Sequence, residues 1–127
     1  MSNIRLDGIE VAIGKELSGY QKSVTEIVKE ACKETADACL EDIKSASPKD
    51  TGAYRRGWKL KKESNNALRV SYVIKNTTKP HLTHLLEKGH AKVNGGRVDG
   101  IPHIKPAEDH AAQMLTKLVE EALKNGS

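Results

Sequence analysis

The stretch LRVSYVIK, residues 68–75, decides the fold class, because apolar and polar side chains alternate along it as in a half-buried β-strand. Its inward-facing set consists of Leu68, Val70, Tyr72 and Ile74. A polar run at residues 64–66 precedes it, and a weaker strand pattern lies before that run at residues 58–63, with Trp58 and Leu60 on the inner side. We therefore predict an antiparallel hairpin with one face in the core.

A long amphipathic helix is predicted upstream of this hairpin, from about residue 20 to residue 46. Its apolar positions recur at helical spacing and are Val24, Ile27, Val28, Ala31, Cys32, Cys39 and Ile43. Pro48 ends the helix, because proline disfavours helical dihedral angles in the residue before it. Residues 1–19 are open to three interpretations, a short strand, a separately packed turn of helix or a flexible arm, since Gly14 and Gly19 weaken any extension of the helix.

Downstream of the hairpin, residues 79–88 are predicted to form a short helix that ends at Gly89. Its inward-facing residues would be Leu82, Leu85 and Leu86. The following stretch, GHAKVNGGRVDGI at residues 89–101, contains four glycines. We predict that it projects from the body as an irregular hairpin, in which segments 91–93 and 101–104 pair around a tip at residues 94–97.

The last helix is predicted to begin at Pro106, which suits a first helical position, and to end at Asn125 and Gly126. Glu108 and Asp109 place negative charge at its start. Its apolar stripe consists of Ala111, Met114, Leu115, Leu118 and Ala122. The predicted architecture is a single α+β domain, residues 1–127, in which the two long helices cover one face of a small antiparallel sheet.

Composition and hydropathy indicate where in the cell the protein acts. The formal charge of +4 favours an anionic partner. No apolar run approaches the ~20 residues that cross a bilayer, and the N-terminus lacks the layout of a secretory signal, so we expect a cytoplasmic protein without membrane contact. Cys32 and Cys39 agree with this location, because about 10 Å of helix separates them and prevents a disulfide within the chain. Both are predicted to be thiols that face the core.

A metal or catalytic site is the sharpest enzymatic hypothesis. The candidate ligands are His81, His84, His90, His103 and His110, with Glu87 and Asp109 nearby. Their spacing matches no closed zinc ligand set, and no Ser or Cys nucleophile lies in a recognisable catalytic motif. Gly95 and Gly96 lack the flanking strand and helix of a phosphate-binding loop. We therefore predict no metal, no cofactor and no catalytic residue.

A cationic segment at residues 51–62, TGAYRRGWKLKK, supports an alternative function as a small basic nucleic-acid-binding module. Its candidate phosphate contacts are Arg55, Arg56, Lys59 and Lys61. They are interleaved with Tyr54 and Trp58, and such a combination can bind phosphates and stack on bases. The charged outer face of a soluble hairpin would explain the same pattern, so weak DNA contact stays an alternative.

Two separated segments resemble one family, the minor tail components of long-tailed bacteriophages, which are tail-completion or head-to-tail joining proteins. Residues 48–57, PKDTGAYRRG, resemble that family's Pro-x-(Asp)-Thr-Gly-x-Leu-(Arg)-(Arg)-Ser signature. Residues 87–107 resemble its Glu-x-Gly-His motif, its Gly-rich loop and its Pro-x-x-x-Pro-Ala helix start. The family commonly has an aromatic residue after the loop proline, where this chain has His103. The resemblance spans roughly residues 20–124.

The resemblance implies a virion structural protein without catalytic activity. Such a protein would assemble in the host bacterial cytoplasm, form a ring with copies of itself, six by the symmetry of tails, and end in the tail or neck of the virion. Its partners would be tail-tube and head-connector proteins. The implied assembly residues lie in the loop and are His90, Lys92, Asn94, Gly95, Gly96 and Arg97. The implied structural residues are Thr51, Gly52, Glu87, Gly89, Pro102 and Pro106. Thr51 would supply a turn or cap hydroxyl, and Gly52 a backbone angle that other residues resist.

Overall fold

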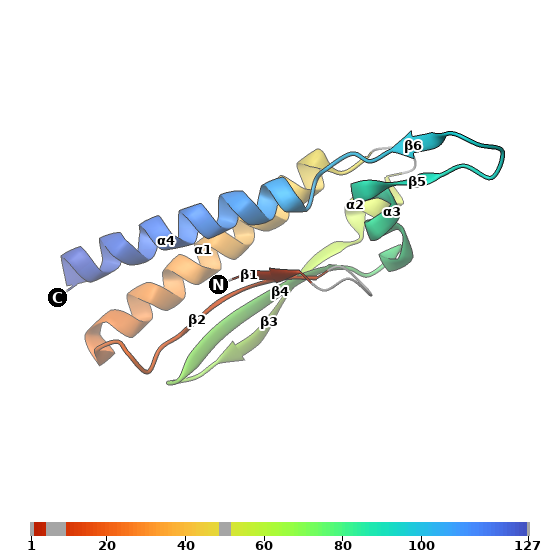
Figure 1. The fold of residues 1–127 in the computed structure, drawn as a ribbon. Helices are drawn as coiled ribbons and strands as arrows, with labels where there is room; N and C mark the ends of the chain where they lie inside the picture. The colour runs from red at the N-terminus through yellow and green to blue at the C-terminus, as the bar shows by residue number, and fades with distance from the viewer. Residues whose placement is uncertain (1, 5–9, 49–51, 127) are drawn as a thin grey trace.

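The computed structural model describes residues 2–4, 10–48 and 52–126, so Thr51 lies outside the described residues. Its helices are α1 Lys22–Ala46, α2 Ala53–Arg56, the 3-10 helix η1 Pro80–Leu82, α3 Thr83–Lys88 and α4 Lys105–Gly126. Its strands are β1 Ser2–Ile4, β2 Glu10–Glu16, β3 Trp58–Asn65, β4 Arg69–Asn76, β5 Gly89–Ala91 and β6 Arg97–Asp99. The predicted α+β class is confirmed. Helices α1 and α4 lie side by side over the sheet, and the β5–β6 hairpin extends from one end of the molecule (Figure 1).

The main sheet is antiparallel with strand order β1-β2-β4-β3. The predicted β3–β4 hairpin is confirmed, and Leu60 pairs with Ile74 in its register. The inward orientation predicted for Leu68 is wrong, because this residue is 65% exposed in the turn. The Asn66 side-chain oxygen accepts hydrogen bonds from the backbone N–H groups of Leu68 and Arg69, which holds Leu68 in the turn and out of the strand.

Half-burial was also predicted for this strand, and it is wrong for Ser71 and Val73, which are buried as well. The reason is that β4 is an inner strand, paired with β2 on one edge and β3 on the other. An inner strand loses more of its surface to its neighbours than an edge strand does. The period-2 pattern therefore identified the strand correctly but understated its burial.

Strand β2 comes from the N-terminal segment for which three interpretations were open. It pairs with β4 along its whole length, from Glu10 opposite Lys75 to Glu16 opposite Arg69. Gly14 permits this pairing, because a Cβ there would lie 2.2 Å from the Val70 carbonyl oxygen. The glycine that weakened a helical interpretation thus serves the close approach of two strands.

Helices α1 and α4 bury their apolar stripes against the sheet and against each other, forming one hydrophobic core. Cys32 and Cys39 are buried free thiols, as predicted. Ile27 was predicted to face the core, but it is 45% exposed. It lines a groove between the two helices, which leaves it accessible to solvent. Among the described residues, no helix is long and apolar enough to cross a membrane.

The segment after the short helix differs from its predicted layout. Strands β5 and β6 lie at residues 89–91 and 97–99, so the predicted pairing of segments 91–93 and 101–104 is wrong. Ile104 is buried in the core beside α4, and the Ile101 backbone N–H donates to the Leu86 carbonyl at 2.8 Å. These contacts hold residues 101–104 against the body. Leu85 is 41% exposed, in contrast to its predicted inward orientation, whereas Leu82 and Leu86 pack on the core.

Candidate assembly interface

We call residues 89–100 the arm, since they form a hairpin that leaves the body of the molecule (Figure 1). The predicted assembly residues all lie in the arm and are exposed, namely His90, Lys92, Asn94, Gly95, Gly96 and Arg97. The turn closes through a hydrogen bond from the Lys92 N–H to the Gly96 carbonyl. Gly95 and Gly96 have φ values of 94° and 82°, which side-chain-bearing residues rarely adopt. Val93 is fully exposed at the tip of the arm.

The base of the arm is packed tightly where it leaves the body. Gly89 has a φ of 79°, and a Cβ on it would lie 2.2 Å from the Val98 carbonyl oxygen. A Cβ on Gly100 would lie 2.4 Å from the Glu87 carbonyl oxygen. The Arg97 guanidinium donates to the Lys88 carbonyl at the end of α3. The arm therefore has a fixed base and an exposed tip.

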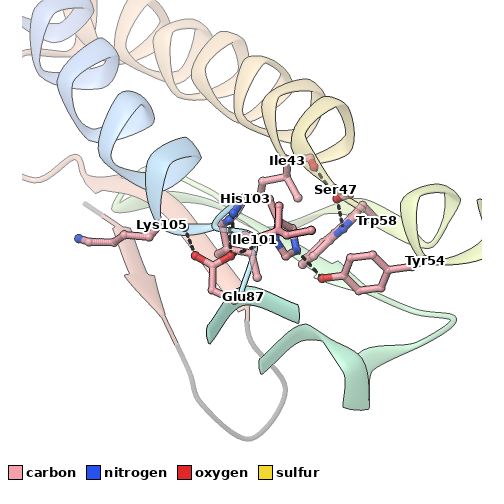
Figure 2. Close-up of polar contacts among 9 residues, drawn as sticks. Ile43, Ser47, Tyr54, Trp58, Glu87, Ile101, His103 and Lys105 are labelled. Carbon is pink, nitrogen blue, oxygen red and sulfur yellow. Dashed lines mark hydrogen bonds and ion pairs between the residues drawn. The ribbon is translucent and has the colours of Figure 1, made fainter. Parts of the chain in front are cut away.

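Glu87, also in α3, holds the start of α4. Its carboxylate is buried, and its Oε1 accepts hydrogen bonds at 2.8 Å from the backbone N–H groups of His103 and Ile104. Its Oε2 accepts a third, at 2.9 Å, from the Lys105 N–H (Figure 2). Backbone N–H groups at a helix start lack partners within the helix and attract negative charge. Glu87, which precedes the arm in the sequence, thus caps α4, which follows the arm.

His103 continues this polar network into the core. Its Nδ1 lies 2.7 Å from the Ile101 carbonyl oxygen and 3.0 Å from Glu87 Oε1. Both neighbours accept hydrogen bonds, so Nδ1 carries a proton, and in the neutral ring Nε2 accepts from the Tyr54 hydroxyl, 2.6 Å away. Burial, followed by the Glu87 charge, raises the pKa of Tyr54, which keeps its hydroxyl protonated as a donor.

His103 also packs as an aromatic ring. Its centroid lies 5.5 Å from that of Tyr54 and 6.3 Å from that of Trp58, with edge-to-face angles of 76° and 72°. The Trp58 indole N–H donates to the Ser47 hydroxyl, which donates to the Ile43 carbonyl (Figure 2). His103 therefore stands where the family commonly has an aromatic residue. Its contacts join α3 to the start of α4 and, through Trp58 and Ser47, to the end of α1.

Residues 52–57 form the corner that receives these contacts. Gly52 has a φ of 77° just before α2, and a Cβ on Gly57 would lie 2.1 Å from the Thr78 hydroxyl. The Asn76 side chain donates to the Tyr54 carbonyl and accepts from the N–H groups of Thr78 and Lys79. Through Tyr54 and His103, the two motifs far apart in the sequence meet at the base of the arm.

Two prolines flank this junction. Pro102 is exposed between the arm and His103, and Pro106 is the second residue of α4. Within the first turn of a helix the N–H groups have no partner in the helix, so the missing N–H of Pro106 removes no helical hydrogen bond. The predicted helix start is thus one residue late.

The four candidate phosphate contacts do not form one patch. Arg55 is partly buried, and its guanidinium donates to the carbonyls of Ser45 and Ser47 at 3.1 Å each, which binds the end of α1. Lys59 and Lys61 are exposed on the sheet face opposite Trp58, and Lys59 pairs directly with Lys75. Arg56 is exposed on α2. Only the strand lysines share one face.

The five histidines are dispersed in the fold. His103 is buried in the network described above, and His110 Nδ1 lies 2.7 Å from Asp42 Oδ2 on the helix surface. His81, His84 and His90 are exposed. Within the described ranges, no group of three or more His, Cys, Asp or Glu side chains is placed to hold a metal ion.

Sequence reasoning singled out Glu87 but missed the Tyr54–His103 contact, the Asn76 bonds and the Ser47–Trp58 pair. The one available signal was His103 itself. The family commonly has an aromatic residue at this position, so a histidine there implied a polar ring in the core. The Ser47–Trp58 pair and the bond from Asn76 to the Tyr54 carbonyl join residues 11 and 22 positions apart that meet only in the fold.

The model of a family described as "Bacteriophage HK97-gp10, putative tail-component" matches residues 12–89. The match includes most of β2, the corner at residues 52–57 and α3, and it ends at the first residue of the arm. No match was found among curated proteins or solved structures.

Proposed function

Because this chain belongs to the HK97-gp10-like family of bacteriophage tail components, we propose that it is a tail-completion protein that joins the tail to the head as a ring of subunits. The finer role rests on one observation, the arm. Ten consecutive arm residues, 90–99, are exposed, while the base is held by close glycine contacts and by the Glu87 carboxylate. A segment with a fixed base and few contacts beyond it is suited to bind a neighbour.

The arm would act by reaching from one subunit to the next. A contact in which one patch meets a different patch closes into a ring when the rotation between subunits allows it. Six copies would follow the symmetry of tails. The Glu87–His103–Tyr54 network would serve this role structurally, by fixing the direction of the arm relative to α4. No catalytic step is part of this function.

Tail-tube and head-connector proteins are the proposed partners at the two faces of the ring. The protein would assemble with them in the cytoplasm of the host bacterium and remain in the tail or neck of the virion. A proposed contact between the ring and DNA rests on a separate observation. Three exposed lysines, Lys59, Lys61 and Lys75, lie on the outer face of the sheet. Salt-sensitive binding of duplex DNA, lost in a Lys59→Ala, Lys61→Ala, Lys75→Ala variant, would support that contact.

Shortening the arm tests the proposed function. Residues 92–96 would be replaced by Asn-Gly, a turn that suits a two-residue hairpin and keeps Ala91 opposite Arg97. The exposed turn contributes no core packing, so the free energy of unfolding should change by less than about 1 kcal/mol. Rings seen by negative-stain microscopy, and joined infectious particles in a complementation assay, should be lost.

A matched control changes the β3–β4 turn, which is also exposed, by Ala67→Ser. This variant should assemble normally. Intact assembly of the arm-shortened protein would refute the proposed role of the arm, and so would a sharply lowered but cooperative unfolding transition, which would assign the arm to the stability of the fold.

A further inference from the structure

A groove of about 290 Å³ runs between α1 and α4 at the end of the molecule that contains the C-terminus of α4. Residues at helical spacing on both helices line it, so one face of each helix contributes. Its floor contains the buried alanines Ala31 and Ala122, and Ile27 lies exposed at its rim. Small residues on both helices leave this hollow, which exposes apolar surface to solvent.

The rim of the groove is acidic. Glu30, Glu34 and Glu121 line it, and no lysine or arginine does. Among the described residues, no hydrogen bond or ion pair joins these three carboxylates to a cation, whereas the neighbouring Lys29 and Lys33 pair with Glu26 and Asp37. The groove therefore offers an apolar floor between unpaired negative charges.

The arm has the complementary pattern. Val93 is fully exposed and Val98 is 39% exposed, so the arm presents apolar side chains to solvent. Lys92 precedes Val93 in the turn and Arg97 precedes Val98 in β6, so a cationic residue adjoins each valine, although the Arg97 guanidinium also donates to the Lys88 carbonyl at the base. Asp99 is the one acidic residue of the arm. Exposed valines beside cationic residues match an apolar floor between carboxylates.

We propose that the arm of one subunit binds in the α1–α4 groove of a second copy of this chain. The arm and the groove lie at opposite ends of the molecule (Figure 1), so a subunit cannot fill its own groove. Each copy then donates an arm at one end and accepts one at the other, which is a heterologous contact. This inference rests on the proposed function and names the surface that the arm meets.

A second hollow, of about 660 Å³, is larger but less suitable. It lies where α1 begins and the β3–β4 turn approaches, and Lys22, Lys29 and Glu26 are its charged lining residues. Glu26 already pairs with Lys29 at 3.6 Å. The excess of positive charge would repel the arm, because like charges brought together at an interface weaken binding. Electrostatics therefore favours the smaller groove.

The arm-shortened protein provides a direct probe, because its groove is present while its own arm is missing. Isotope-labelled arm-shortened protein would be titrated with unlabelled wild-type protein, and its NMR resonances followed. We expect shifts at Ala31, Ala122 and Leu118 of the groove. The shifts should weaken as salt is added, because the contact pairs exposed charges.

Charge reversal gives the specific test. Lys92→Glu in the unlabelled partner should weaken binding by at least about tenfold, and Glu121→Lys in the labelled partner should do the same. Combining the two reversals should restore much of the affinity, since opposite charges face each other again. Glu120→Lys, an exposed change next to the groove, is the matched control and should leave binding unchanged.

The outcomes separate this inference from the proposed function. If arm shortening abolishes rings but the groove resonances do not move, the arm binds elsewhere and the inference is overturned while the proposed function stands. Shifts that appear but survive both single reversals would also overturn it, because charge complementarity would then play no part. If arm shortening leaves rings intact, the proposed role of the arm in ring formation is refuted, and the inference that depends on it is refuted too.

Discussion

Glu87 joins two segments of the chain, α3 and residues 103–105, at one carboxylate. It stands in α3, accepts three backbone N–H groups at the start of α4, and lies 3.0 Å from His103 Nδ1. A charged acceptor makes stronger hydrogen bonds than a neutral one, and here it also faces the positive end of a helix. The residue that the family resemblance singled out thus acts in the structure as a remote helix cap.

Removal of this cap should destabilise the fold measurably. Glu87→Ala would leave buried N–H groups without a partner, and we expect the free energy of unfolding to fall by about 2–4 kcal/mol in urea denaturation. Glu87→Gln keeps an acceptor oxygen of similar shape and should lose only about half as much. Equal and negligible effects of the two substitutions would show that water caps α4 equally well.

A second prediction about individual residues concerns the two buried thiols, Cys32 and Cys39. Burial, together with the charges of Asp42 and Glu108, raises the pKa of Cys39 to about 12, and burial raises the pKa of Cys32. The thiolate is the reactive form, so a raised pKa leaves almost none of it at neutral pH. Labelling by a thiol reagent should therefore be slow in the folded protein and fast in denaturant. Rapid labelling of both thiols without denaturant would place this face of α1 in solvent.

At the scale of elements, periodicity located the long helices and the β3–β4 hairpin because apolar side chains recur at a regular spacing along each of them. Strand β2 places two of its seven residues, Val11 and Ile13, in the core, so its pairing with β4 could not be read from local sequence. The predicted strand pairing of the arm was wrong for a similar reason. The contacts that set its register are backbone approaches at Gly89 and Gly100, and these leave no periodic trace.

The candidate site was predictable only in part. Glu87 and the arm residues were singled out through the family resemblance, and the exposed arm follows from its glycines. The apparent phosphate cluster was misleading, because cation spacing does not show that Arg55 binds the carbonyls of Ser45 and Ser47. Side-chain direction depends on tertiary partners, and a single sequence does not display them.

The two glycines of the N-terminal segment allow a matched test of the β2–β4 pairing. Gly14→Ala places a Cβ 2.2 Å from the Val70 carbonyl oxygen, and backbone atoms must move to accept it, so we expect a loss of about 1–3 kcal/mol in the free energy of unfolding. Gly19→Ala meets nothing within 4 Å and should change stability by less than about 1 kcal/mol. Similar effects at both positions would argue against the tight pairing of the two strands.

At the scale of the whole molecule, self-association must appear in the thermal stability. A ring binds folded subunits and not unfolded chains, so mass action should raise the melting temperature with protein concentration. For a chain of 127 residues we expect a rise of roughly 3–8 °C over a hundredfold concentration range, measured by differential scanning calorimetry. The arm-shortened protein should show a constant melting temperature, close to the dilute wild-type value, since its core is unchanged. The Glu120→Lys variant should follow the wild type, because its altered charge lies outside the groove. A concentration-dependent rise that persists without the arm would mean that the subunits associate through another surface, and a constant wild-type value would mean that the free protein does not form rings by itself.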